Sequence, residues 1–269
     1  MRRFFEAICE IFFPPACISC GELVYMDYPA KSPAFCEECA PIWERAKARQ
    51  CRRCFREYAK CRCVPPLMKK GGVTALLKLV PWGSAAFSGV PEKVILGIKR
   101  LPYERTFSFL ARELAPELTA YVREANGRLF AEGKTPPETV VSFLPRRKNT
   151  VLYLGFDQAR EIARKLADEA QVIFSPLLKR KRDGLAQKTL TQEERMLNMQ
   201  CAFALVGDPR GKRVVLLDDV VTTGASMAAA ARLLLQAGAV EVVAACAALT
   251  EKKETRRFAV VGRRRQVRS

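Results

Sequence analysis

Apolar and polar residues change period along most of the chain. Short apolar runs that fit buried strands alternate with stretches in which apolar residues recur every three or four positions, as on one face of a helix. The predicted strands are 73–80, 85–88, 139–144, 201–206, 213–217 and 240–245. The predicted helices are 91–100, 105–124, 156–169 and 226–237. Because strands and helices alternate, we expect an α/β domain with a mostly parallel, doubly wound sheet.

The first section of the chain, to about Val64, shows no such period. A Pro-Pro pair at 65–66 and a Gly-Gly pair at 71–72 predict a linker between this section and the α/β domain. The predicted strands 73–80 and 85–88 lie on either side of Pro81-Trp82-Gly83. We therefore predict a cysteine-rich module over residues 1–66, an α/β domain over residues 73–250 and a basic tail over residues 251–269.

Nine of the eleven cysteines lie in the first 63 residues. Eight of them form close pairs: Cys17, Cys20, Cys36, Cys39, Cys51, Cys54, Cys61 and Cys63. Two such pairs can surround one ion with four thiolates, so the pattern predicts a structural zinc module. Sequential pairing gives two four-cysteine sites, while crossed pairing or a single zinc stays open. Disulfides or a redox CxxC motif are the competing interpretations.

Three cysteines, Cys9, Cys201 and Cys246, fit no pair and are expected to be buried as small apolar residues. Histidine is absent from the chain, so no mechanism can use an imidazole. The formal net charge of +18 favours nucleic acids, phosphorylated metabolites or anionic lipid as partners, and a solvated basic surface is the plainer interpretation.

No apolar window approaches the roughly 20 residues of a membrane span. The segment 1–15 begins with two arginines, but Glu6 and Glu10 interrupt its apolar run, so we interpret it as an amphipathic lead-in rather than a signal peptide. We therefore expect a cytoplasmic protein whose thiols stay reduced.

The most informative stretch is 214–226, which reads VVLLDDVVTTGAS. An apolar strand delivers Asp218 and Asp219 to the carboxyl edge of the sheet, where open α/β sheets bind ligands. A hydroxyl-rich turn then opens a helix, whose free N–H groups suit a phosphate. An ordinary strand–turn–helix with an exposed acidic pair is the plain alternative. A Walker B strand is rejected, because the only P-loop candidate, 127–135, has the wrong glycine spacing and follows a helix.

This stretch resembles the phosphoribosyl diphosphate (PRPP) motif of type I phosphoribosyltransferases. The resemblance implies that the two aspartates hold the ribose 2- and 3-hydroxyls and that Mg²⁺ accompanies PRPP. It also implies a phosphate cradle for the 5-phosphate. The residues of that cradle are Val221, Thr222, Thr223, Gly224, Ala225 and Ser226.

The cysteine pairs ahead of this motif are similar to those of ComF proteins, which are linked to DNA uptake and competence. The segment 155–159, GFDQA, is similar to the family's GFNQA. Eight further residues follow the family's order and spacing: Arg180, Arg182, Gln187, Leu190, Arg195, Asn198, Ala202 and Phe203. The resemblance covers about 14–250 and implies a type I phosphoribosyltransferase fold behind an N-terminal double zinc ribbon. Asp157 stands in place of the usual Asn and Leu154 in place of a usual Arg, which leaves the acceptor substrate open.

Two basic segments are candidates for holding diphosphate. Arg146 and Arg147 follow the strand 139–144, at the place where the resembling fold has its diphosphate-binding loop, and arginines suit a diphosphate. The plain alternative is that this segment is only a basic surface loop. The stretch 179–195 has the polarity of a mobile loop that closes over the reaction.

A second function is compatible with the same features. The protein would then be a single-stranded-DNA-binding accessory of the competence or DNA-uptake machinery, with a regulatory or vestigial PRPP site. Four aromatic residues near the cysteine pairs could stack bases, although core packing is the favoured interpretation: Phe35, Trp43, Phe55 and Tyr58. A nucleotide-salvage enzyme is the weakest hypothesis, since such enzymes do not usually carry cysteine modules.

Overall fold

The computed structural model describes residues 15–24, 34–83, 89–100, 104–181 and 202–251. Its helices are α2 (Cys39–Ala48), α3 (Pro66–Lys70), α4 (Val90–Arg100), α5 (Glu104–Ala131), α6 (Lys148–Leu154), α7 (Gln158–Glu169) and α9 (Ala225–Gln236). Its strands are β1 (Val73–Trp82), β2 (Thr139–Phe143), β3 (Ile173–Phe174), β4 (Leu178–Arg180), β5 (Phe203–Leu205), β6 (Arg213–Val221) and β7 (Glu241–Thr250). None of the described helices is long and apolar enough to cross a membrane.

The predicted parallel sheet is confirmed. Five strands pair in the order β1-β7-β6-β2-β3, and every pairing is parallel. The central strands β6 and β7 are buried along nearly their whole length, which explains their unbroken apolar runs. The carboxyl end of β6, with its two aspartates, therefore lies in the middle of one sheet edge.

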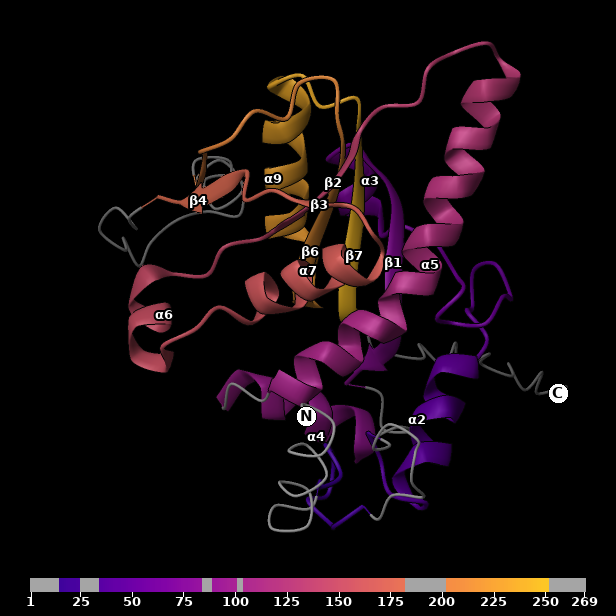
Figure 1. Ribbon diagram of the computed structural model, residues 1–269, viewed down its shortest axis with the longest axis vertical. Coiled ribbons are helices and arrows are strands. Elements are labelled where there is room, and N and C mark those ends of the chain that lie inside the picture. The colour runs from indigo at the N-terminus through magenta and orange to yellow at the C-terminus, as the bar shows by residue number, and fades with distance from the viewer. Residues whose placement is uncertain (1–14, 25–33, 84–88, 101–103, 182–201, 252–269) are drawn as a thin grey trace, which may run out of the picture.

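Helices cover both faces of this sheet (Figure 1). One hydrophobic cluster joins α4, α5 and α7 to one face, and it includes Cys17, Phe35 and Trp43 of the cysteine module. A second cluster joins α3 and α9 to the other face, together with the antiparallel pair of strands β4 and β5. The module thus shares a core with the α/β domain, while the predicted domain boundaries stay a prediction.

The segment predicted as a linker is a short helix with a packing role. Helix α3 begins at Pro66, a favoured first position, and buries Met68 completely. A Cβ on Gly71 would lie 2.6 Å from the Cα of Ala228 in α9. Gly71 therefore permits close contact with the backbone of α9, and Gly72 makes room for the side chain of Leu235. Glycine pairs are also common in flexible linkers, so the sequence does not distinguish the two roles.

Several predicted boundaries were wrong. Strand β1 does not end at the predicted Val80 but continues through Pro81 and Trp82, because β1 is an edge strand and an edge tolerates a residue without an N–H donor. Helix α5 runs seven residues beyond the predicted Glu124, and β7 extends to Thr250. Helix α6 and strands β3 and β4 are too short to show a period in the sequence. The predicted strand 85–88 and the tail from 252 lie outside the described residues.

Candidate phosphate-binding site

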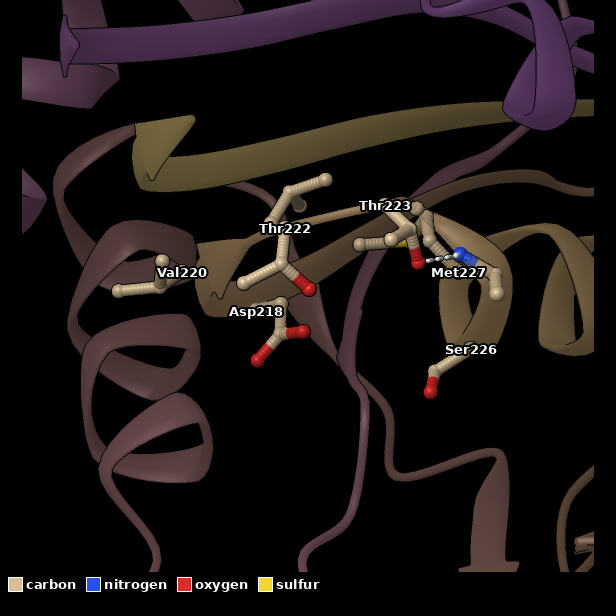
Figure 2. A pocket seen from close by; sticks show the side chains of 9 residues that line it. Asp218, Val220, Thr222, Thr223, Ser226 and Met227 are labelled. Atoms are coloured by element: carbon tan, nitrogen blue, oxygen red, sulfur yellow. Dashed lines mark hydrogen bonds between the residues drawn. The ribbon is translucent and has the colours of Figure 1, made fainter. Parts of the chain in front are cut away.

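The candidate site is a pocket at the carboxyl end of β6. It is lined by Asp218, Val220, Val221, Thr222, Thr223, Gly224, Ala225, Ser226 and Met227. Figure 2 shows the oxygen atoms of Asp218, Thr222 and Ser226 presented on the same side of the loop between β6 and α9. The structure therefore brings one predicted acid and the whole predicted cradle into one polar pocket.

The loop reaches α9 through Gly224, which has a φ of +77°. This left-handed conformation suits glycine, and a residue without a side chain leaves the first-turn N–H groups of α9 open toward the pocket. Thr223 supports the turn by accepting a 3.4 Å hydrogen bond at Oγ1 from the N–H of Ala225 (Figure 2). No acidic residue lies in the first turn of α9. These features fit a bound phosphate rather than a cation.

The two aspartates have different surroundings. Successive residues of a strand point to opposite faces, so Asp218 lines the pocket while Asp219 turns toward the α7 face. There Asp219 is 6% exposed and accepts a 2.6 Å ion-pair hydrogen bond from the guanidinium of Arg146. The expectation that both acids hold ribose hydroxyls stays a prediction, and in this structure Asp219 is bound to a residue of the predicted diphosphate loop.

Arg146 is fixed at both its side chain and its backbone. Its N–H donates a 3.0 Å hydrogen bond to Oδ2 of Asp157, which is also the N-cap residue of α7. Arg147 lies at the N-cap of α6 and is exposed. Leu154 ends α6, and Gly155 closes that helix with a φ of +79°. The GFDQA segment thus connects α6 to α7 and anchors Arg146. The predicted helix 156–169 included Asp157, but Asp is a preferred N-cap residue, so the sequence could have suggested that α7 begins after it.

The carboxylates carry unusual proton affinities. Burial raises the pKa of Asp218 well above its ordinary value, and the neighbouring negative charge of Asp219 raises it further. Burial also raises the pKa of Asp157, although its hydrogen bonds from the backbone of Arg146 and Arg160 oppose that rise. Shifted pKa values gather at functional sites, which agrees with the place of Asp218 in the pocket lining.

The eight paired cysteines form two clusters with sequential pairing: Cys17, Cys20, Cys36 and Cys39, then Cys51, Cys54, Cys61 and Cys63. Within each cluster the Sγ atoms all lie within 4.8 Å of one another. Zinc–sulfur bonds of about 2.3 Å place neighbouring thiolates about 3.8 Å apart, and the Sγ atoms of Cys20 and Cys36 are 3.7 Å apart. The residues therefore fit tetrahedral zinc, and crossed pairing is not what the structure shows.

The first CxxC pair of each cluster forms a tight turn of the same kind. The residue after the second cysteine has a positive φ in both, +82° at Gly21 and +59° at Phe55. Short bridges, between Ala16 and Leu23 and between Gln50 and Glu57, close the two turns. Such a turn places two thiolates on one side, as a metal site requires.

The second cluster packs against the carboxyl edge of the sheet. Lys78 of β1 is 2% exposed and donates a 2.6 Å hydrogen bond to the carbonyl oxygen of Cys61. Tyr58 donates to the carbonyl oxygen of Leu249 in β7, and Arg49 forms a 2.8 Å ion pair with Glu251. The cysteine module is therefore fastened to the same sheet edge that carries the pocket.

Three of the four aromatic residues considered for base stacking belong to the core. Phe35, Trp43 and Tyr58 are 7%, 1% and 3% exposed, which confirms core packing for them. Phe35 and Trp43 pack on Phe109 of α5 with ring centroids 5.1 and 5.3 Å apart. Phe55 alone of the four is exposed, at 72%.

Other predicted features fall partly or wholly outside the described residues. Cys246 is buried, as expected, while Cys9 and Cys201 are not described. Of the predicted mobile loop 179–195, residues 179 and 180 belong to β4, and the part from 182 onward is not described.

Comparison with protein families finds one domain. Residues 150–265 match the family model of the phosphoribosyl transferase domain. This match covers less than half of the chain, but it contains the pocket and its flanking elements α7, β6 and α9. A search of curated protein sequences finds no match. The match supports a phosphoribosyltransferase with an α/β fold.

Three solved structures resemble parts of the chain. The allosteric regulatory enzyme of purine biosynthesis shares 24% identity at a TM-score of 0.31, over 46% of this chain and 25% of that chain. The glutamine PRPP amidotransferase of B. subtilis, complexed with ADP and GMP, shares 22% identity at a TM-score of 0.31, over 46% and 26%. A hypoxanthine phosphoribosyltransferase from Staphylococcus aureus shares 10% identity at a TM-score of 0.33, over 56% and 76%.

The chain thus spans about a quarter of the length of the first two structures. Because all three TM-scores are low, these likenesses add nothing to the family match.

Proposed function

We propose that this protein is a ComF-like phosphoribosyltransferase that binds PRPP with Mg²⁺ and transfers or hydrolyses the phosphoribosyl group. The single observation that carries the proposal is the pocket lined by Asp218 and residues 220–227, in which a buried strand delivers a carboxylate beside a hydroxyl-rich loop that opens a helix. The match of residues 150–265 to the phosphoribosyl transferase domain supports the same function.

Each part of PRPP has a candidate partner. The 5-phosphate would lie against Thr222, Thr223 and Ser226 and the N-terminus of α9, where N–H groups and the helix dipole favour negative charge. Asp218 and Asp219 would accept hydrogen bonds from the ribose hydroxyls. Arg146 and Arg147 would neutralise the diphosphate.

The chemistry requires positioning and charge stabilisation. As the acceptor's bond to ribose C1 forms, the bond from C1 to the diphosphate oxygen breaks, and the diphosphate leaves with the electron pair. Fixed cations beside that oxygen lower the barrier because negative charge grows there. Carboxylate oxygens suit Mg²⁺, which would supply further positive charge to the diphosphate when bound. No side chain need act as a nucleophile, so the lack of histidine is no obstacle.

We propose a structural role for the cysteine module. Four thiolates leave no open position on zinc, so the two ions would stabilise the module without taking part in the reaction. The resemblance to ComF proteins supports a role in DNA uptake, and the proposed partners are single-stranded DNA and the competence machinery, with the cytoplasm as the proposed location. Phe55 is exposed and lies along the chain between two exposed arginines, Arg53 and Arg56, which is compatible with a nucleic-acid partner.

Calorimetric titration of PRPP with Mg²⁺ tests the proposal. Wild type is expected to bind, and a variant with Asp218→Asn and Asp219→Asn is expected to lose binding. Asp208→Asn is a matched control, because Asp208 is an exposed acid whose partner, Arg210, is two residues away. If folded, zinc-loaded wild type does not bind PRPP, the proposal fails, and salt-sensitive binding of single-stranded DNA becomes the function to measure.

A further inference from the structure

The loop that would hold diphosphate is fixed by one carboxylate. The chain after β2 stays hydrogen-bonded to β6 as far as Leu144, whose N–H donates a 2.8 Å hydrogen bond to the carbonyl oxygen of Leu217. Pro145 comes next and has no N–H to donate. Arg146 then donates its N–H to Asp157, at 3.0 Å. The position of Arg146 after the end of the strand therefore depends on Asp157.

Asp157 is itself held rigidly. It is 7% exposed and precedes α7, and its Oδ1 accepts a 3.3 Å hydrogen bond from the N–H of Arg160. Helix α7 buries Ile162 and Leu166 completely against the sheet. A loop fixed to this cap is thus fixed to the core of the domain.

The two oxygens of Asp157 accept hydrogen bonds from two different N–H donors, Oδ2 from Arg146 and Oδ1 from Arg160. A carboxylate can do this because both its oxygens are acceptors. An asparagine has one acceptor oxygen, and its NH₂ group would face the second N–H. The usual Asn of the resembling family could cap α7 in this geometry, but it could not also hold Arg146 in this way.

The side chain of Arg146 shows why this backbone anchor matters. Its guanidinium is 2.6 Å from the Asp219 carboxylate, at the acidic pair of the candidate ribose site. An arginine that starts at a fixed Cα has fewer arrangements to lose when it binds an anion. Asp157, Arg146 and Asp219 thus form a chain of contacts from the start of α7 to the end of β6.

We infer that Asp157 is a positioning residue for diphosphate: it fixes Arg146 so that the guanidinium lies between the ribose-binding acid and the diphosphate of PRPP. This inference rests on the proposed function and adds a residue to it. Asp157 touches no substrate and acts through Arg146. It should therefore affect ligands that carry diphosphate and leave ribose 5-phosphate binding unchanged.

Calorimetry with two ligands and a double-mutant cycle tests the inference. Asp157→Asn is expected to weaken PRPP binding about tenfold, the effect of losing one ordinary hydrogen bond. Its affinity for ribose 5-phosphate should equal that of wild type. In an Arg146→Ala background, Asp157→Asn should have no further effect on PRPP binding.

Two further variants separate positioning from stability. Asp157→Ser keeps a capping oxygen for α7 but cannot serve both donors, so it should reproduce the effect of Asp157→Asn. Asp168→Asn, on the exposed end of the same helix, should bind PRPP like wild type.

The inference is overturned if Asp157→Asn binds PRPP as wild type does, weakens ribose 5-phosphate binding equally, or costs the same factor with and without Arg146. If wild type binds both ribose 5-phosphate and PRPP but the Asp157→Asn variant gives one of these overturning results, the inference fails and the proposed function stands. If wild type binds neither ligand, the proposed function fails and the inference falls with it.

Discussion

The side chain of Met68 occupies the space where Gly224 would carry a Cβ atom. An added Cβ would lie 2.5 Å from Cγ of Met68 and 2.7 Å from Sδ. Met68 belongs to α3, in the segment that joins the cysteine module to the sheet, and it is completely buried. The phosphate loop is therefore packed directly on the connection to the module.

This contact predicts a large effect of Gly224→Ala. The φ of +77° costs an alanine about 1–2 kcal/mol, and the clash with a buried side chain adds to this cost. We expect urea unfolding to show a loss of about 2 kcal/mol or more, together with lost PRPP binding. Gly133→Ala is the matched control, because Gly133 has a φ of +69° with nothing within 4 Å of its added Cβ.

The clash can be separated from the backbone strain. Adding Met68→Ala to Gly224→Ala removes the clashing atoms, so the two losses in unfolding free energy should sum to more than the double variant loses. Additive losses would show that Met68 does not press on the loop.

Asp218→Asn is predicted to stabilise the free protein near neutral pH. Below the ordinary pKa of 3.8, Asp218 is protonated in both the folded and the unfolded chain. Above it the unfolded chain releases the proton, while the raised pKa keeps it on the folded protein, so the free energy of unfolding falls as pH rises. Asparagine removes this loss. The variant's advantage in urea unfolding should be present at about pH 7 and shrink toward about pH 4.

Asp219→Asn is the contrasting variant for this pH experiment. Asp219 pairs with Arg146, so its replacement removes a favourable contact and should not stabilise the protein. An Asp218→Asn variant that is less stable than wild type at neutral pH would contradict the raised pKa.

The buried ammonium of Lys78 beside the second cysteine cluster indicates that this cluster is negatively charged, as zinc-bound thiolates would be. Zinc with four thiolates carries a net charge of −2, and a buried ammonium beside Cys61 would balance part of it. Within the described part of the chain, no carboxylate forms an ion pair with Lys78. Lys78→Met should therefore speed chelator removal of one zinc and lower thermal stability. If the cluster held neutral thiols instead, the same change would remove an uncompensated charge and stabilise the protein.

Replacing Arg213, which lies at the end of β6 away from the pocket, should lower the stability of the protein. At the amino end of β6 its side chain is 2% exposed and contacts Glu241 at 2.5 Å and Asn126 at 2.7 Å. Arg213→Met leaves the partly buried carboxylate of Glu241 without its cation, so we expect a loss of about 2–3 kcal/mol in urea unfolding with PRPP affinity unchanged in the folded protein. Arg210→Ala, which breaks a fully exposed pair, should leave the free energy of unfolding nearly unchanged.

The sequence by itself determined the parallel sheet, the carboxyl-edge position of the acidic pair and the cysteine pairs. These features depend on local patterns: unbroken apolar runs mark buried strands, and CxxC spacing brings two thiolates together. The cradle of Val221 to Ser226 could be predicted for the same reason, because a strand, a turn and a helix that follow one another must meet at one sheet edge.

Only the tertiary structure decided which residues from distant parts of the chain meet. Strand alternation could have placed Asp218 and Asp219 on opposite faces, but the partner of Asp219 is Arg146, 73 residues earlier. The glycines at 71–72 fit a flexible linker equally well until α9 lies against them. Lys78 lies in a strand pattern that does not reveal a Cys61 carbonyl above it. Such contacts depend on packing between elements, and local sequence carries no record of the partner.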